Sequence, residues 1–210
     1  MNKSPTSDGL ARKHKILIVG TDSSCKDLII EISGLTQPLD NINCAQVCGT
    51  SHNVKRISGN LTKIDIGLNL GLGPDPWHRV IPYFKKHARA SIKTFRSAIK
   101  GYNRIILLCD TDDYLGLACM EPLSECARME SIGISGFFLS PLFPDTNPRS
   151  NLYANAVLDL ALQKLDSYTV LPRRVVSDEE TLEECLKQND AIAIEMIKML
   201  DASVSIARAS

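Results

Sequence analysis

Short apolar runs, each followed by a turn signal and then a helical pattern, constrain this chain more than any other feature. Lys15–Gly20 reads KILIVG, and Arg104–Cys109 reads RIILLC. Runs of this kind bounded by turn residues are typical of buried strands. Because strands that alternate with helices build parallel sheets, the sequence predicts an α/β fold with a doubly wound, mostly parallel sheet flanked by helices.

The expected elements follow from the same patterns. Strands are predicted at 15–20, 43–48, 63–66, 104–109, 136–140 and 168–171. Helices are predicted at 26–33, 77–100, 117–131, 150–165 and 177 to about 201. Ser177 and Glu180 have the spacing of a capping box, which opens the last helix. Residues 1–14 are expected to form a flexible leader, and Gly67–Pro76 a loop.

Composition excludes several classes of protein. The 210 residues include 24 basic and 24 acidic side chains, so the net charge indicates no polyanionic partner. No apolar stretch reaches the ~18–20 residues that span a bilayer, and the polar N-terminus does not resemble a secretory signal. Seven cysteines lack zinc-site spacing. We therefore expect a cytoplasmic protein with reduced thiols and no membrane span.

Ligands of doubly wound sheets bind at the carboxyl ends of the strands. In this sequence those ends are 20–26, 47–52, 109–116 and 141–149. No G-x-G-x-x-G follows the first strand, so the sequence does not support an ordinary dinucleotide-binding module with an unrelated small ligand.

Several segments carry a resemblance to one family. Gly71–Gly73 followed by Asp75–Pro76 is similar to a shortened GLGAGGNP segment, and Asp166–Pro172 is similar to a D-x-L-I-x-I-P-N-D strand. Asp145 and Arg149 keep the spacing of an E-G-x-x-R element. In this order, from about residue 15 to 202, the segments resemble the nucleotide-binding half of the tubulin/FtsZ family.

The resemblance implies a domain plan and a ligand. Residues 15–176 would form the nucleotide-binding domain, 177–202 a long core helix and 203–210 a tail, and GTP or GDP would be the ligand. Ribose and base contacts would come from Asp145, Arg149, Asn189 and Asp190, and phosphate contacts from Gly20, Ser23, Ser24, Gly73 and Gly116. Simpler interpretations stay open: a surface ion pair for Asp145 and Arg149, a helix cap for the serines, and a solvated turn for Asn189 and Asp190.

The phosphate loops depart from the family pattern. The family's GGGGxN loop is replaced by Gly20–Cys25, and its GGGTGTG signature by Asp113–Cys119, in which Tyr114 and Leu115 would crowd a phosphate. A run of acidic residues would also repel a phosphate group, unless the carboxylates of the run hold Mg²⁺. The run consists of Asp110, Asp112 and Asp113.

The chain also stops before the loop that carries the family's catalytic acid, and we expect the C-terminal activation domain to be absent. The resemblance then implies a divergent FtsZ-like protein of cell division or cytoskeletal organisation. It would be a degenerate GTPase that acts as an interaction or regulatory module, together with an FtsZ filament or copies of itself. The alternative is a GTP-binding GTPase with remodelled loops, whose catalytic acid comes from a partner chain.

One charge pattern belongs to no motif. Lysines and arginines recur down one face of helix 77–100, at Lys85, Arg89, Lys93, Arg96 and Lys100. The face is either solvated and paired with acids such as Glu179, Glu180, Glu183 and Glu184, or it docks an acidic partner. No aromatic residues are interleaved for base stacking, so nucleic acid is not expected. His52, His78 and His87 are expected on the surface.

Overall fold

The computed structural model describes residues 15–21, 25–36, 41–49, 61–67, 77–111, 114–140 and 148–171, together with positions 181, 183, 184, 187, 188, 191, 194 and 195. The strands are β1 (Ile16–Gly20), β2 (Ile42–Cys48), β3 (Thr62–Asp65), β4 (Arg104–Asp110), β5 (Gly133–Leu139) and β6 (Ser167–Leu171). The helices are α1 (Lys26–Thr36), α3 (Trp77–Ala90), α4 (Ile92–Ile99), α5 (Tyr114–Met129) and α6 (Pro148–Lys164). No helix among the described residues is long and apolar enough to cross a membrane.

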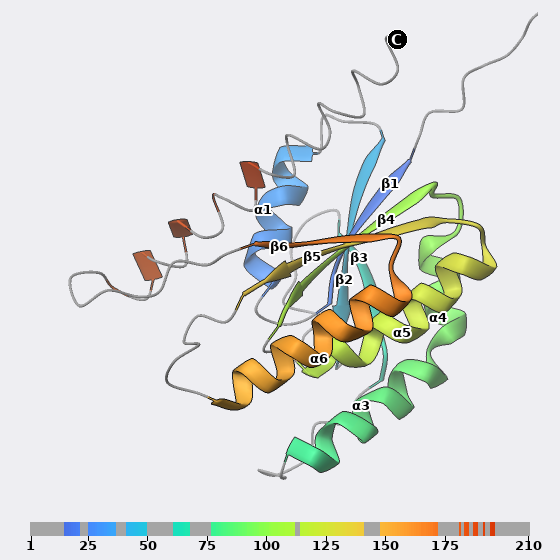
Figure 1. The fold of residues 1–210 in the computed structure, drawn as a ribbon. Coiled ribbons are helices and arrows are strands. Elements are labelled where there is room, and N and C mark those ends of the chain that lie inside the picture. Colours follow the sequence, from blue (N-terminus) through green and yellow to red (C-terminus); the bar gives the residue numbers. More distant parts are fainter. Residues whose placement is uncertain are drawn as a thin grey trace, which may run out of the picture.

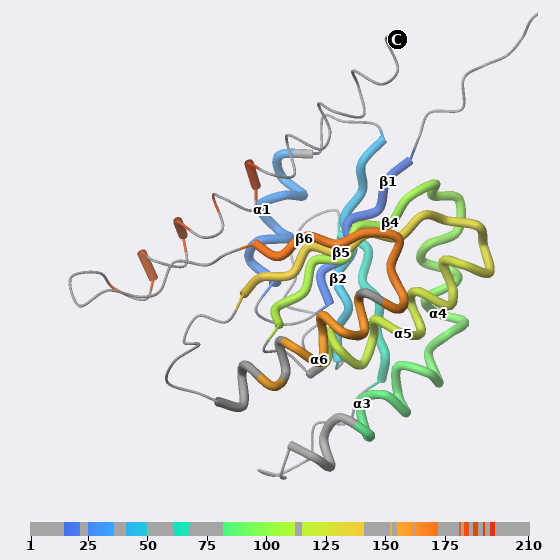
Figure 2. Tube along the Cα trace, in the orientation of Figure 1, coloured from blue at the N-terminus to red at the C-terminus, as the bar shows by residue number. Residues whose placement is uncertain are grey.

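The predicted doubly wound sheet is confirmed. Its six strands are all parallel and follow the order β3-β2-β1-β4-β5-β6. α1 covers one face, and α3, α4, α5 and α6 cover the other (Figure 1). The Cα trace shows the same layers, with β1 and β4 side by side in the middle of the sheet (Figure 2).

Apolar residues on both faces of the strands build two cores. Leu17 and Val19 of β1 belong to the core under α3–α6, whereas Ile16 and Ile18 belong to the core under α1. Successive side chains of a strand point to opposite faces, so a run that is apolar throughout supplies both cores at once. Ile194, from the chain beyond β6, joins the core under α1.

The single helix predicted at 77–100 is wrong, because the structure has two helices divided at Ser91. The Ser91 hydroxyl donates to the carbonyl of His87 (3.0 Å) and lies 3.4 Å from that of Ile66. Its amide is shared between the carbonyls of His87 and Ala88 (both 3.1 Å). A serine that bonds back to the preceding turn competes with the helical ladder and bends it.

The bounds of α5 also differ from the predicted 117–131. The helix begins at Tyr114 and ends at Met129. Two residues later, Ser131 has a positive φ of 56°. The amide of Ile132 then donates to the carbonyl of Ala127 (2.8 Å), and that of Ser131 to Arg128 (3.2 Å). This is the left-handed cap that commonly ends a helix, here formed without glycine.

The capping box predicted at Ser177 and Glu180 falls on residues outside the described set. The structure has such a box four residues later, at Thr181. The Thr181 hydroxyl accepts a bond from the amide of Glu184 (3.3 Å), and the Glu184 carboxylate accepts from the Thr181 amide (3.0 Å) and hydroxyl (2.7 Å). These bonds lower the pKa of Glu184. Thr181 is itself not helical, whereas Glu183 and Glu184 are, which is the arrangement of a cap before a helix.

Six of the seven cysteines lie within the described residues, and all six are buried and outside any disulfide. Burial is the main cause that raises the pKa of Cys48 and Cys126, and the carboxylates of Asp65 and Glu125, respectively, add to it. Cys185 lies outside the described set. The six described thiols therefore contribute to the core as small apolar side chains.

Candidate functional site at the switch point of the sheet

The strand order reverses between β1 and β4, and this fixes where a ligand crevice can form. The connection after β1 leads to one side of the sheet and the connection after β4 to the other, so their carboxyl ends flank a switch point. α1 begins at Lys26 and α5 at Tyr114, each close after its strand. Helix N-termini carry partial positive charge and free amides, which favours anionic ligands at this edge.

Two threonines directly follow the neighbouring strands β1 and β4, and each hydrogen-bonds to the next strand of the sheet. The amide and the hydroxyl of Thr21 both lie within bonding distance of the Leu108 carbonyl, at 3.1 and 3.3 Å. In the same way, the amide and hydroxyl of Thr111 donate to the Leu139 carbonyl, at 3.1 and 2.9 Å. Each threonine is 1% exposed. A hydroxyl has one proton, so neither side chain keeps a donor for a ligand in this arrangement.

Sequence reasoning did not single out these threonines. Thr21 directly follows Gly20, where the first strand was predicted to end, and Thr111 lies two residues after Cys109, where the strand at 104–109 was predicted to end. That repeated position was the available signal. A polar residue with a short hydroxyl side chain after a buried strand is well placed to continue the ladder by one more bond.

Gly20, predicted to contact phosphate, has a packing role in the structure. A Cβ at this position would lie 2.5 Å from Oε1 of Gln46 and 3.5 Å from Cβ of Ile29. Gln46 is 2% exposed, and its amide nitrogen donates to the Val47 carbonyl (3.1 Å). The buried Gln46 side chain therefore occupies the space that a larger residue at position 20 would need.

Asp110 and Gly116 lie on the β4 side of the switch point. Asp110 is the last residue of β4 and is 5% exposed, which places a carboxyl group at the carboxyl edge of the sheet. Gly116 is buried in the first turn of α5 and does not have a positive φ. Leu115 packs against the core under α3–α6, so the expected crowding of a phosphate by this side chain is not supported.

The structure thus brings Gly20, Asp110 and Gly116 to one edge. The remaining predicted residues lie outside the described set: Ser23, Ser24, Gly73, Asp112, Asp113, Asp145, Asn189 and Asp190. Arg149 lies in the first turn of α6, but its side chain is not among those described. Within the part of the chain that is described, no three His, Cys, Asp or Glu side chains are grouped as metal ligands. The ligand contacts expected of these residues stay predictions.

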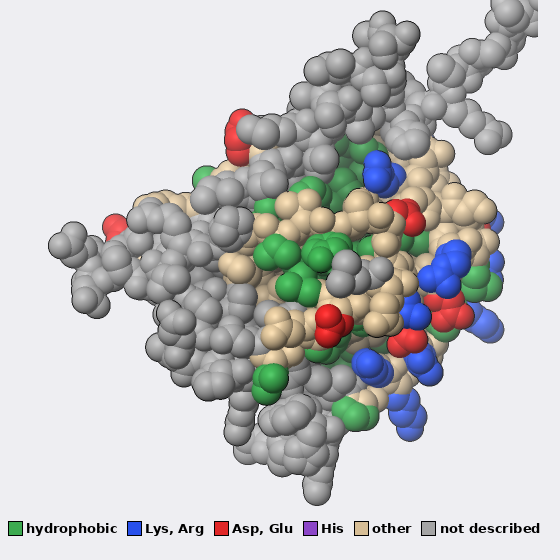
Figure 3. Space-filling view, in the orientation of Figure 1, with side chains coloured by type: hydrophobic (Ala, Val, Ile, Leu, Met, Phe, Trp, Pro, Cys, Tyr) green, Lys and Arg blue, Asp and Glu red, His purple; other side chains and the backbone are tan. Residues whose placement is uncertain are grey.

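The basic face of α3 and α4 has acidic neighbours, although not those first expected. Nη2 of Arg89 lies 3.2 Å from Glu121 of α5, and Nε of Arg96 lies 2.9 Å from Glu130, the residue that follows α5. Figure 3 shows basic and acidic side chains intermingled on this side of the molecule.

Two of the four acids expected as partners of that face are described, and both make other contacts. Glu183 pairs with Lys187 (2.8 Å), while Glu184 forms the box with Thr181. Glu179 and Glu180 lie outside the described residues, as does His52. His87 is half-buried, with its ring 4.5 Å from that of Tyr83, and the side chain of His78 is not described.

Comparison with solved structures identifies the fold. FtsZ from M. jannaschii (W319Y mutant) matches with a TM-score of 0.68 and 16% identity, over 90% of this chain and 56% of that one. CetZ2 from Haloferax volcanii, as a GTPγS-bound protofilament, matches with 0.67 and 13%, over 89% and 57%. TubZ of Clostridium botulinum phage c-st, without its C-terminal tail, matches with 0.66 and 12%, over 90% and 62%.

The chain therefore spans little more than half the length of these proteins. No protein-family model and no curated protein matches the sequence. At these identities the likeness concerns the fold, which is tubulin/FtsZ-like as the resemblance implied.

Proposed function

From the tubulin/FtsZ-like fold of this chain, we propose that it is a cytoplasmic interaction or regulatory module of an FtsZ-like cytoskeleton, with a degenerate guanine-nucleotide site. The fold likeness carries this proposal. The matched structures include a dimer of M. jannaschii FtsZ, a GTPγS-bound CetZ2 protofilament and a TubZ protofilament of bacteriophage PhiKZ. By analogy, the partner is a second copy of this chain or an FtsZ-like filament.

The residues at the switch point support weak nucleotide binding. A phosphate cradle needs free backbone amides and hydroxyls, but the hydroxyls of Thr21 and Thr111 donate to backbone carbonyls. Asp110 adds a buried carboxyl group to the same edge. An ionised carboxylate at ~5 Å from a phosphate oxygen costs about 3 kcal/mol at an effective dielectric constant near 20. These features disfavour a tightly held triphosphate.

The same carboxyl group is the observation that favours the alternative function. Asp110 is held rigidly at the end of a central strand, and with Asp112 and Asp113 it would be suited to hold Mg²⁺ beside a nucleotide. The chain would then be a GTPase whose catalytic acid comes from a partner. The two functions predict opposite effects of removing the charge at position 110.

Calorimetry with GTP, with and without Mg²⁺, compares the wild-type chain with Asp110→Asn. If the carboxylate repels phosphate, the variant binds GTP more tightly, by up to about 100-fold for a repulsion of about 3 kcal/mol. Asp159→Asn, an exposed position on α6, serves as the control and leaves the affinity unchanged. Micromolar binding by the wild type that needs Mg²⁺ and is lost in Asp110→Asn would establish the alternative.

Co-sedimentation tests the interaction itself. The purified chain is spun with and without GTP, alone and with a full-length FtsZ. Pelleting that depends on FtsZ supports the proposal, and pelleting of the chain alone supports self-assembly. GTP turnover by the chain alone contradicts the proposed interaction module.

The basic face of α3 and α4 is the surface proposed to meet an acidic partner. Arg89 pairs with Glu121 and Arg96 with Glu130, whereas no ion pair within the described residues involves Lys85, Lys93 or Lys100. We expect Lys85→Gln combined with Lys93→Gln to reduce co-sedimentation, and added salt to do the same. Unchanged pelleting of the double variant would exclude this surface.

A further inference from the structure

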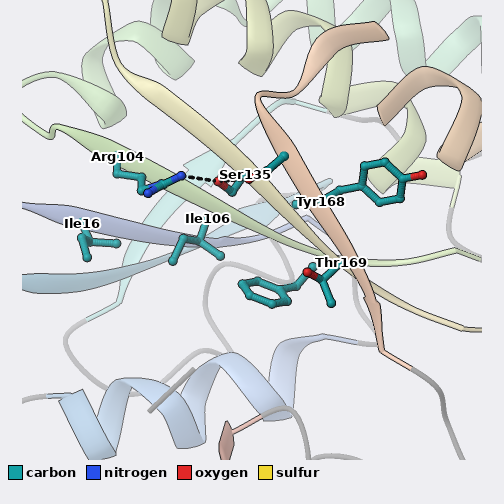
Figure 4. A pocket seen from close by; sticks show the side chains of 9 residues that line it. Ile16, Arg104, Ile106, Ser135, Tyr168 and Thr169 are labelled. Atoms are coloured by element: carbon teal, nitrogen blue, oxygen red, sulfur yellow. Dashed lines mark hydrogen bonds between the residues drawn. The ribbon is translucent and has the colours of Figure 1, made fainter. Parts of the chain in front are cut away.

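A hollow lies on the α1 face of the sheet, over the amino-terminal ends of four strands. Its volume is about 120 Å³. It is lined by Ile16, Arg104, Ile106, Ser135, Gly136, Phe137, Ser167, Tyr168 and Thr169 (Figure 4). The switch point lies at the opposite ends of these strands. Along β4, Ile106 of the hollow and Asp110 of the switch point are four residues apart, or about 13 Å.

One wall of the hollow is a chain of polar groups that crosses three strands. Nη2 of Arg104 donates to Oγ of Ser135 (3.0 Å), which lies 2.9 Å from Oγ of Ser167. Figure 4 shows the guanidinium directed at Ser135. Among the described residues no carboxylate pairs with Arg104. A guanidinium has five N–H donors, so most of them remain for a ligand.

The opposite wall is apolar. Ile16, Ile106 and Phe137 are between 4% and 5% exposed and also belong to the core under α1. Tyr168 contributes little more than its backbone, because its ring packs on the other face, 6.0 Å from that of Phe138. The hollow therefore offers one cationic group at the edge of a small apolar surface.

We infer that this hollow binds a small organic monocarboxylate with an apolar body of about one ring. Arg104 takes the carboxylate through paired N–H bonds, and the body lies on Ile16, Ile106 and Phe137. At about 120 Å³ the hollow is smaller than the ~150 Å³ apolar cavity that holds benzene in another protein, so only the apolar body enters it and the carboxylate lies at its edge beside Arg104. A free phosphate leaves the apolar wall uncovered, and a folded partner is too large to enter.

NMR titration of the 210-residue chain with benzoate tests the inference. The expected dissociation constant is about 1 mM, as the affinity of so small a ligand is limited. Amide shifts should be confined to the hollow, with Ser135, Ser167 and Thr169 among them. Benzyl alcohol, of the same shape without the charge, should bind at least about 10-fold more weakly.

Variants separate recognition from folding. Arg104→Lys keeps the charge but loses the paired geometry, and should weaken benzoate binding about 10-fold. Ser135→Ala removes the hydroxyl beside the guanidinium and should weaken it about 3-fold. The control is Arg128→Lys, at an exposed site on α5, which should change nothing. Circular dichroism and the melting temperature check that each variant is folded.

Three results would overturn the inference: equal binding of benzyl alcohol, unchanged benzoate affinity of folded Arg104→Lys, or shifts spread over the lysines of α3 and α4. No nucleotide is present in the titration. Its outcome therefore does not depend on whether the switch point binds GTP, and the two proposals can fail separately.

Discussion

Replacing Gly136 by alanine tests close packing between the sheet and the core under α3–α6. Gly136 lies in the interior of β5 and faces the core under α3–α6. An added Cβ would lie 2.7 Å from Cδ1 of Leu165 and 2.7 Å from two ring carbons of Phe138. The glycine leaves room for the Phe138 ring to fold back over its own strand, and that ring in turn contacts Tyr168.

The cost follows from these distances. Ordinary van der Waals contact begins at 3.4 Å, so the neighbours must move by about 0.7 Å. Phe138 is 0% exposed, so its ring cannot relieve the contact by turning out into solvent without a larger rearrangement. Overpacking of this kind costs about 1–3 kcal/mol, offset by about 0.4–1 kcal/mol because alanine reduces the freedom of the unfolded chain. We expect a net loss of about 1–2 kcal/mol, which lowers Tm by about 2–8 °C in a chain of this length.

Thermal and urea unfolding, followed by circular dichroism, measure the loss. Gly133→Ala is the matched control, because it lies on the same strand and its Cβ would meet nothing closer than 3.6 Å. That variant should be as stable as the wild type or slightly more stable. If Gly136→Ala is no less stable than Gly133→Ala, the packing of Phe138 over Gly136 does not exist as described.

Further predictions concern thiols, a helix cap and an ion pair. Burial raises the pKa of Cys48 and Cys126, so at about pH 8 iodoacetamide should label them slowly in the native chain and rapidly in urea, as mass spectrometry would show. The bonds from Thr181 lower the pKa of Glu184, so they stabilise the fold above the ordinary Glu pKa and are lost as pH falls through the lowered value. In an NMR pH titration, Thr181→Ala should raise the pKa of Glu184 toward its ordinary value, whereas Thr181→Ser should keep it low; equal values would contradict the box. Arg96→Ala removes the ion pair with Glu130 and should lower the free energy of unfolding by about 0.2–1 kcal/mol. Because salt screens exposed charges, the loss should be smaller at about 1 M salt. Urea unfolding at low and high salt measures both values, and a loss that does not shrink at high salt would refute this.

The local sequence pattern predicted most of the helices and strands, because an apolar run that must be buried has few alternative conformations. β4 was expected at 104–109 and ends at Asp110, and α1 was expected to begin at Lys26, where it does. The errors occur where a single side chain changes the backbone. Ser91 divides one amphipathic pattern into two helices, and Ser131 ends α5 in the left-handed region, a conformation for which glycine is the usual signal.

The candidate site was predicted less completely. The resemblance pointed to Gly20 and Gly116, and the acidic run that departs from the family pattern pointed to Asp110; the structure brings all three to the switch point. It did not point to Thr21 or Thr111, whose partners lie on neighbouring strands 87 and 28 residues away in sequence. The phosphate contact assigned to Gly20 stays a prediction, and the structure adds that this glycine makes room for the side chain of Gln46, a residue of β2.

The sequence by itself determined that strands and helices alternate and that the central strands are buried on both faces, because periodicity and apolar content act over a few neighbouring residues. Only the tertiary structure decided which strands are adjacent, since pairing joins residues that no local pattern relates. Three of the strands carry a polar residue near their start: Arg104 in β4, Ser135 in β5 and Ser167 in β6. They became one wall of a hollow because β4, β5 and β6 lie side by side in a particular register.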